Sequence, residues 1–418
     1  MNLIIRNARI IEKNHPLNKE ITDIQISNGK IEKIGKNLPI PNDYEEITFP
    51  DLHISKGWID TSVSLGEPGF EDRETISNGL RVASKSGFTA ILLQPNSAPI
   101  LDNQAQIYFV KEKASQSATN IYPIGALTKN SNGNDLAELV DMKNTGAIAF
   151  GDYNKNLDNA NILKIALQYT QDFDGKVITY SMDSNIKGKG IVNEGIISTQ
   201  LGLKGIPSLA EELIIARNLY ILEYTGGKLH IPTLSTAYSV ELIRQAKTKG
   251  LQVSCSVSVH HLILNDEILT SFDSNYRVTP PIRTEKDRKA LIEGILDNTI
   301  DCITSDHNPI DIENKNLEFD LAKNGTIGLE SCYSALETIF PTEVIVEKLT
   351  SGRKVFKIEE SSIKEGEIAN LTLFSPNKNW IFLKENILSK SKNSAFINQP
   401  MKGKVIGIIN NNQFIKNE

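Results

Sequence analysis

The feature that most constrains the fold is an alternation of strand-like and helix-like segments, repeated about eight times through the middle of the chain. Short apolar runs alternate with longer segments of helical character. The expected strands are residues 57–65, 89–94, 120–126, 147–150, 176–181, 228–234, 251–257 and 300–305. The expected helices are residues 73–86, 104–115, 135–144, 160–171, 208–224, 237–249, 285–297 and 328–339. Eight such units in sequence predict an α/β fold of the (β/α)8 barrel type.

A doubly wound open sheet is the alternative α/β architecture. The glycine-rich turn that would favour it after the first strand is absent from this sequence. Helix-start signals support the expected helices. Pro207 suits the first turn of the long helix at 208–224, and Thr284 with Asp287 resembles a capping box. We therefore favour the barrel.

Both ends of the chain have β character. Residues 24–27 and 30–34 alternate with period two around Asn28-Gly29, a signal for a type I′ hairpin. Near the other end, residues 369–374 and 403–409 are strand-like. We expect residues 1–55 and 346–418 to fold together as one small β domain beside a barrel at residues 56–345.

Composition excludes several classes of protein. The 418 residues are 39% hydrophobic and 23% charged, with a net charge of −6, which fits a globular chain and gives nucleic acid no basic face. No apolar run is long enough to span a membrane, and the first residues do not resemble a signal peptide, so we expect a cytoplasmic protein. The three cysteines (Cys255, Cys302 and Cys332) predict no disulfide framework. Cys255 and Cys302, on expected strands, should be small buried hydrophobes.

Function in a barrel of this type lies where the strands end and the following loops begin. Polar residues gather at six of these positions, in segments 60–69, 94–97, 150–153, 179–183, 230–236 and 304–310. Further distinctive motifs lie in segments 192–195, 201–207, 210–212, 260–262, 280–283 and 300–307. The last two contain Pro-Pro-Ile-Arg and Asp-Cys-Ile-Thr-Ser-Asp-His.

Together these motifs make the chain resemble the dihydroorotases of the amidohydrolase superfamily, over nearly its whole length. The resemblance implies a barrel with a composite β-sandwich built from both termini. It also implies a place in de novo pyrimidine biosynthesis, where the family reversibly cyclises N-carbamoyl-aspartate to dihydroorotate. That reaction uses zinc-bound hydroxide, since zinc lowers the pKa of water from about 15.7 to about 7.

At the positions where the resemblance places zinc ligands, this chain has other residue types. Two family histidines on the first strand correspond to Ser62 and Ser64. Those at the ends of strands five and six correspond to Tyr180 and Thr233, and the acidic pair after strand four is reduced to Asp152. Neutral hydroxyls are poor zinc ligands at neutral pH. We therefore expect no zinc and no other cofactor.

The substrate-binding positions are altered as well. The arginine and histidine that hold the substrate carboxylate in the family correspond to Gly66 and Ile310. Asn96 resembles the substrate-contacting asparagine, and Asp306 resembles the general base, so both are vestiges of a site. Asn96 equally suits a turn, and Asp306 a hydrogen bond inside the barrel mouth.

No other histidine replaces the missing ligands. The chain has six, His15, His53, His230, His260, His261 and His307. The first two precede the barrel, and His230 lies three residues before Thr233, an odd offset that should turn it away from the barrel axis. The other three match family histidines that do not bind zinc. A serine nucleophile paired with Asp306 would also lack a histidine base.

The sequence thus predicts a non-catalytic dihydroorotase homologue whose hydroxyls fill the old metal cavity and hydrogen-bond one another. Zinc-less relatives in this family associate with aspartate carbamoyltransferase, so the resemblance implies that enzyme as partner, through an apolar surface patch outside the barrel. A homo-oligomer is a further expectation, with neither nucleic acid nor membrane as partner. Two alternatives stay open: an active dihydroorotase or related cyclic amidase with an altered site, and a small-ligand-binding module using Asn96 and Asp306.

Overall fold

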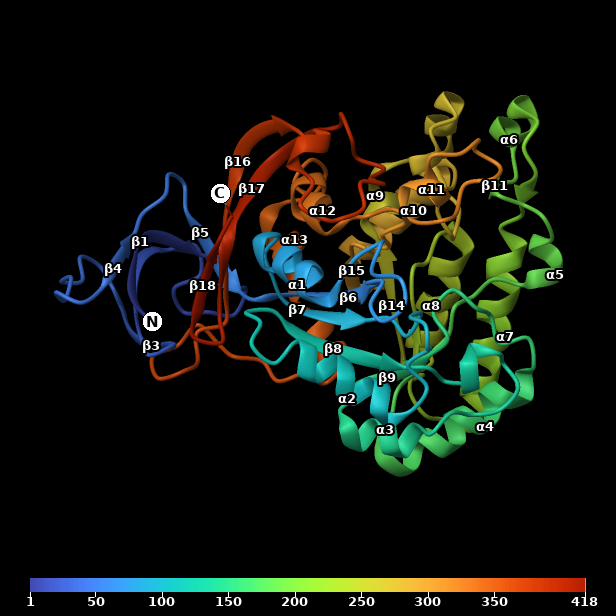
Figure 1. The fold of residues 1–418 in the computed structure, drawn as a ribbon, viewed down its shortest axis with the longest axis horizontal. Helices are drawn as coiled ribbons and strands as arrows, with labels where there is room; N and C mark the ends of the chain where they lie inside the picture. The colour runs from blue at the N-terminus through green and yellow to red at the C-terminus, as the bar shows by residue number, and fades with distance from the viewer. Residues whose placement is uncertain (418) are drawn as a thin grey trace.

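Eight parallel strands form a closed barrel in the computed structural model, which describes residues 1–417 of the chain (Figure 1). The strands are β6 (Trp58–Val63), β7 (Phe88–Leu93), β8 (Asn120–Gly125), β9 (Ala149–Gly151), β10 (Val177–Ile178), β13 (Leu229–Ile231), β14 (Val253–Ser258) and β15 (Cys302–Thr304). Neighbours in this order are hydrogen-bonded. The ring closes where the Ser64 amide donates to the His307 carbonyl at 2.7 Å. The predicted barrel is confirmed, each strand in its expected place.

Helices surround the barrel, and each expected helix is present within a few residues. They are α1 (Ile76–Lys85), α2 (Gln104–Lys113), α3 (Leu139–Thr145), α4 (Ala160–Tyr169), α7 (Leu209–Thr225), α8 (Ala237–Thr248), α10 (Glu285–Leu296) and α12 (Leu329–Leu336). Thr284 caps α10 by accepting a hydrogen bond from the Asp287 amide, as the sequence predicts. In the described part of the chain, no helix has the length and apolar character of a membrane span.

An arm between β10 and α7 was not expected from the sequence. It contains α5 (Ser184–Lys187), β11 (Val192–Asn193), α6 (Ile196–Leu201) and β12 (Gly205–Ile206). β11 and β12 pair only with each other. Two-residue strands carry no periodicity that a sequence pattern could reveal. Two further short helices, α9 (Val259–Ile263) and α11 (Ile312–Lys315), follow β14 and β15. In Figure 1 the arm lies on the side of the barrel away from the β domain.

Strands from both ends of the chain share one eight-stranded sheet, as predicted. They are β1 (Asn2–Ile10), β2 (Ile21–Ser27), β3 (Lys30–Gly35), β4 (Glu45–Ile47), β5 (His53–Lys56), β16 (Leu371–Ile381), β17 (Pro400–Asn410) and β18 (Gln413–Lys416). β5 pairs antiparallel with β16, which joins the two ends. Asn28 and Gly29 have φ of 49° and 76°, as the predicted type I′ turn requires. Isoleucines and leucines of β1, β2 and β16 form the separate core of this domain.

The C-terminal limit of the barrel differs from the predicted boundary at residues 345–346. That boundary falls inside α13 (Thr342–Thr350), which packs on β6 and β15 and is followed by α14 (Gly352–Val355). The buried Arg353 of α14 donates hydrogen bonds to the carbonyl of Gly57, just before β6, and to the hydroxyl of Thr89, within β7. The barrel unit therefore extends through α14.

His230 lies inside the barrel, which corrects the expectation that it faces away from the axis. Its ring bonds to the hydroxyls of Ser254 and Ser256 and stacks 5.0 Å from the Phe356 ring. Phe356 belongs to the apolar cluster formed by inward-facing residues of β6 to β10. The alternation counted from Thr233 fails because β13 ends at Ile231 and Thr233 has φ of +49°. Cys255, Cys302 and Cys332 are free cysteines, as expected. Cys255 and Cys302 are buried, as predicted, and so is Cys332.

Candidate functional site

The polar mouth of the barrel is built around two side-chain pairs at the ends of β6, β7 and β15. Ser62 Oγ donates to Asp306 Oδ1 at 2.8 Å, and Gln94 Nε2 donates to Ser62 Oγ at 3.1 Å. Ser64 Oγ lies 3.0 Å from Asn96 Oδ1 and 2.8 Å from Asn96 Nδ2. Four residues selected from the sequence therefore do meet, as a serine–aspartate pair and a serine–asparagine pair.

Asp306 is the titratable group at the centre of the mouth. Burial raises the pKa of its carboxyl to about 7; the hydrogen bond from Ser62 opposes the shift, and the nearby Asp60 adds to it. Asp60, which was not singled out from the sequence, is fully buried, and burial raises its pKa too. It accepts hydrogen bonds from the Ser62 and Ser305 amides, which fixes β6 against the loop after β15. Burial in the mouth thus favours the protonated, neutral form of Asp306 and Asp60.

Tyr180 and Thr233 line the same small space, but their hydrogen bonds in the described structure go to other residues. The Tyr180 hydroxyl lies 2.6 Å from Thr279 Oγ1, and burial raises the pKa of Tyr180 well above its ordinary value. The Thr233 amide donates to Ser256 Oγ at 3.4 Å. The space bounded by Tyr180, Thr233 and Pro280 has no room for a water-sized sphere. The hydroxyls of Ser62, Ser64 and Tyr180 therefore bond to residues outside the former ligand positions, which corrects the expectation that these hydroxyls bond to one another.

Asp152 has its own partner away from these pairs. Its carboxylate accepts hydrogen bonds from the Thr128 amide at 3.0 Å and the Thr128 hydroxyl at 2.5 Å. Burial raises the pKa of Asp152, and these hydrogen bonds oppose the shift. Its contacts thus hold the loop after β8.

The two substrate-anchor positions have no anchoring group. Gly66 lies in a tight turn, where an added Cβ would come 1.8 Å from the Phe70 carbonyl oxygen, so this backbone admits no side chain. Ile310 is buried, and its amide donates to Asn393 Oδ1 at 3.1 Å. Neither position presents a cation or an imidazole to the mouth.

These residues do not fit the zinc that the family resemblance implies. Among residues 1–417 there is no cluster of three or more His, Cys, Asp or Glu side chains arranged to hold a metal. Zinc prefers imidazole nitrogen, thiolate and carboxylate ligands. Ser62, Ser64, Tyr180 and Thr233 offer neutral hydroxyls that are already hydrogen-bonded or packed.

The histidines of the barrel are engaged elsewhere. His260 and His261 both contact Ser258 Oγ, and His261 Nε2 lies 3.1 Å from the Pro281 carbonyl oxygen. Burial lowers the pKa of His261 to about 4, so its ring is neutral at pH 7. His307 Nδ1 accepts from the Gly328 amide at 3.2 Å. None of these contacts brings a ring to the Ser62–Asp306 pair.

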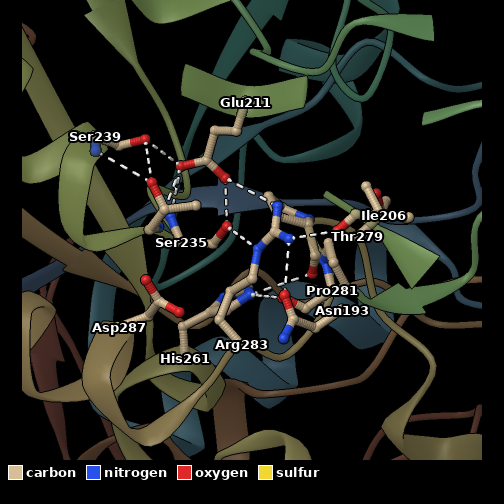
Figure 2. Close-up of polar contacts among 12 residues, drawn as sticks. Asn193, Ile206, Glu211, Ser235, Ser239, His261, Thr279, Pro281, Arg283 and Asp287 are labelled. Atoms are coloured by element: carbon tan, nitrogen blue, oxygen red, sulfur yellow. Dashed lines mark hydrogen bonds and ion pairs between the residues drawn. The ribbon is translucent and has the colours of Figure 1, made fainter. Parts of the chain in front are cut away.

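A buried arginine network joins the unexpected arm to the barrel (Figure 2). Arg283 Nη1 donates to Asn193 Oδ1 at 3.0 Å and to the Ile206 carbonyl at 2.8 Å, and its Nε donates to Ser235 Oγ at 3.1 Å. Its Nη2 lies 3.9 Å from Glu211 Oε2. Both charged side chains are almost fully buried.

Glu211 holds the other side of this network. Its carboxylate accepts from the Ser235 amide at 2.9 Å and from Ser239 Oγ at 2.8 Å (Figure 2). The motifs that contain Asn193, Glu211 and Arg283 are distinctive in the sequence, but no role was predicted for these three residues. Charged residues within otherwise apolar motifs were the available signal, because buried charges need partners. The network fixes β11 and β12 beside the mouth.

Comparison with known proteins gives consistent matches. Residues 53–239 match the family model described as Dihydro-orotase-like. A dihydroorotase from Caldicellulosiruptor saccharolyticus is 40% identical over 100% of this chain and 99% of its own length. One from Geobacter metallireducens is 35% identical over 96% of both chains. The solved structure of an L-hydantoinase from Arthrobacter aurescens superimposes with a TM-score of 0.87 at 19% identity, covering 99% of this chain and 96% of that one, which shows the shared fold.

Proposed function

Since this chain belongs to the dihydroorotase family, we propose that it is a non-catalytic member of pyrimidine biosynthesis that has lost its zinc ligands. The observation that carries the proposal is the pairing of Ser62 with Asp306 and of Ser64 with Asn96. Hydroxyls stand where the family reaction needs imidazoles, and they are occupied by hydrogen bonds.

The chemistry of ring opening supports this proposal. Attack on an unreactive ring amide needs an activated nucleophile and stabilisation of the developing oxyanion. Ser62 has a carboxylate partner but no imidazole base, and an Asp306 with a pKa of about 7 is only half ionised at neutral pH. At Gly66 and Ile310, no group pairs with the substrate carboxylate. We therefore infer that the site lacks an activated nucleophile, zinc ligands and a group that binds the substrate carboxylate.

Metal analysis and turnover test the proposal on protein purified without chelator. We expect zinc well below one equivalent and dihydroorotate hydrolysis at background, with the Caldicellulosiruptor saccharolyticus dihydroorotase as positive control. Asp306→Asn should leave this background unchanged. Bound zinc at one equivalent, or hydrolysis that disappears in Asp306→Asn, would contradict the proposal.

An active dihydroorotase with an altered site is the second candidate. The full-length relatives named dihydroorotase favour it, as does a carboxyl with a pKa of about 7, a range in which a general base works well. This candidate requires a substrate-dependent rate in which Asp306 takes part. The same turnover assay therefore decides between the two.

For the non-catalytic role we propose aspartate carbamoyltransferase as partner, bound through an apolar face of α7. Five exposed residues of α7 follow one another at separations of four, three, four and four, which places them on one helical face. They are Leu209, Leu213, Ala216, Tyr220 and Tyr224. Figure 1 places α7 on the side of the barrel opposite the β domain.

The size of this α7 face suits a specific interface. Tyr220 and Tyr224 are each 76% exposed, and Tyr238 at the start of the neighbouring α8 is 56% exposed. The three rings together expose on the order of 400 Å², since one aromatic side chain offers about 150–250 Å². With Leu209 and Leu213, which are each about half exposed, the patch would supply the larger part of the roughly 800 Å² that each partner contributes to a standard interface. Large exposed apolar patches mark interaction sites.

Light scattering on a mixture with the aspartate carbamoyltransferase of the same organism tests the partnership. We expect a complex at micromolar concentration that is lost when Tyr220→Ser and Tyr224→Ser are combined. Asn96→Ala in the mouth and Tyr108→Ser on α2, whose ring is 63% exposed, serve as controls and should leave the complex intact. If the proteins elute separately and carbamoyltransferase activity and stability are unchanged, the partnership is wrong. The ligand-binding role through Asn96 and Asp306 would then take its place.

A further inference from the structure

A large cleft lies at the opposite end of the barrel from the mouth. Its cavity volume is about 1160 Å³. The starts of the barrel strands form one wall, at Lys176, Lys228 and residues 252–254. Residues 11–14 of the β domain and residues 343–360, which include α13 and α14, form the others. This cleft shares no lining residue with the Ser62–Asp306 site.

The charge of this cleft is opposite to that of the whole protein. Nine lysines line it, against five carboxylates, whereas the chain as a whole has a net charge of −6. The lysines are Lys13, Lys19, Lys56, Lys176, Lys228, Lys247, Lys348, Lys354 and Lys357. A concave surface with an excess of positive charge attracts anions, because its low-dielectric walls focus the field. The cleft is therefore suited to an anion.

Two of the more deeply placed lysines are not neutralised by carboxylates. Lys176 Nζ lies 5.3 Å from the Phe356 ring centre and 3.4 Å from Ser254 Oγ, and it forms no ion pair with the residues that the structure describes. Lys348 Nζ donates to the Ile300 carbonyl at 2.7 Å and to Asn298 Oδ1 at 3.0 Å, both uncharged acceptors. By contrast, the five carboxylates of the cleft are ion-paired with Lys13, Lys19, Lys56 and Lys247. Lys228 and Lys357 pair with Asp174.

Burial is the main cause of lowered pKa values at two of the cleft lysines. Burial lowers the pKa of Lys176 to about 8; Asp301 and Cys302 oppose this shift, and Lys357 adds to it. Burial and the neighbouring Lys357 and Lys143 lower the pKa of Lys228 to about 8, although Lys228 and Lys357 share a contact with Asp174. Lys228 and Lys357 have Asp174 as a counter-charge, whereas the charged form of Lys176 has no paired carboxylate among the described residues and is disfavoured by burial. A bound anion beside Lys176 would offset that cost.

We propose that this cleft binds a small molecule that carries two or more phosphate groups. Lysine ammonium groups act as point charges for phosphate oxygens, and several of them favour a multiply charged ligand over a single anion. The volume is that of a site for a nucleotide-sized molecule. The proposal goes beyond the non-catalytic role and does not depend on it, because it concerns the other end of the barrel.

Calorimetric titration with sodium tripolyphosphate tests the site on the full chain at 150 mM salt, with inorganic phosphate and ATP as further probes. We expect saturable binding of tripolyphosphate at least tenfold tighter than that of inorganic phosphate. Tighter binding of ATP than of tripolyphosphate would identify a nucleotide, and equal binding a simple polyphosphate. Combining Lys176→Met with Lys228→Met should weaken binding at least tenfold, whereas Lys384→Met, an exposed lysine outside the cleft, should have no effect.

Proton linkage gives a second measurement that does not rely on these variants folding well. Anion binding should raise the pKa of Lys176 and Lys228, so binding at pH 8 should take up protons, seen as a buffer-dependent enthalpy. Charge-retaining Lys176→Arg should keep the binding but reduce the proton uptake. Absence of saturable binding, or binding of equal strength in the double lysine variant, would overturn the proposal.

Discussion

Replacement of Asp306 by Asn tests whether the mouth is built without a metal. Asp306 accepts a hydrogen bond from Ser62 at 2.8 Å and has no cationic partner among the described residues. An asparagine side chain at this position would keep an oxygen acceptor for Ser62 but could not ionise. We therefore expect Asp306→Asn to stabilise the fold, and to do so more strongly at high pH.

The magnitude follows from the difference between the folded and unfolded pKa values. The folded pKa is about 7 and the ordinary value is 3.8, so between these values the folded state binds more protons than the unfolded state. The free energy of unfolding therefore falls as the pH rises through this window. One pKa unit corresponds to about 1.36 kcal/mol. The raised pKa of Asp306 therefore lowers the free energy of unfolding by about 4 kcal/mol at pH 8, and by less than half of this at pH 5. The gain from Asp306→Asn should therefore be about 2.5 kcal/mol larger at pH 8 than at pH 5.

Urea unfolding, followed by the fluorescence of the buried Trp58, measures this difference at the two pH values. Comparing two pH values of one variant cancels any pH-independent effect of the amide. Asp43→Asn, at an exposed position, is the matched control and should show no such pH dependence. An equal effect at both pH values, or a loss of stability at pH 8, would refute the reasoning. The second result would mean that a cation, such as a bound metal, holds Asp306 ionised.

Two further predictions concern the framework of the site. Arg283→Met should lower the free energy of unfolding by about 3 kcal/mol, because it leaves Glu211 buried without its cation; Arg244→Met, in an exposed ion pair, should cost less than about 1 kcal/mol. If urea unfolding gave the same loss of stability for Arg283→Met and Arg244→Met, the buried network would contribute no more to stability than an exposed ion pair. Gly66→Ala should destabilise by about 3 kcal/mol because its Cβ would overlap the Phe70 carbonyl, whereas Gly195→Ala, with its nearest atom at 3.6 Å, should be tolerated. A stable Gly66→Ala protein would mean that the turn can open to admit an anchor.

The barrel was predictable because its strands are buried on both faces and therefore form short apolar runs between helices. The arm was not, since β11 and β12 have two residues each and are held by Arg283, which lies far along the chain. The prediction that His230 faces away from the barrel axis was wrong because β13 ends at Ile231, before Thr233. Alternation in a strand predicts side-chain direction only while the backbone stays extended.

The candidate site shows the same limit. Ser62, Ser64, Asn96 and Asp306 could be chosen from the sequence because each follows an expected strand. Which of the two serines pairs with Asp306 could not be chosen, since Asp306 has a positive φ that a strand pattern does not predict. Gln94, which donates a hydrogen bond to Ser62, lies in no motif that would single it out in the sequence. Position along a strand is thus available from sequence, whereas hydrogen-bond partners depend on the loop backbone.

The two polar centres of the barrel differ in how they treat charge, and this difference supports the non-catalytic proposal. In the mouth, hydroxyl–carboxyl and hydroxyl–amide pairs have no cation, and Asp306 is stable when protonated. In the Arg283–Glu211 network, both charges are buried and surrounded by hydrogen-bond partners. A buried ion pair is costly to assemble and strongly destabilising when halved, so it is useful mainly where it fixes a particular geometry. Here that geometry is the position of the arm beside the mouth. Within residues 1–417 the Arg283–Glu211 ion pair therefore fixes shape, which fits our proposal that this protein contributes through its surface.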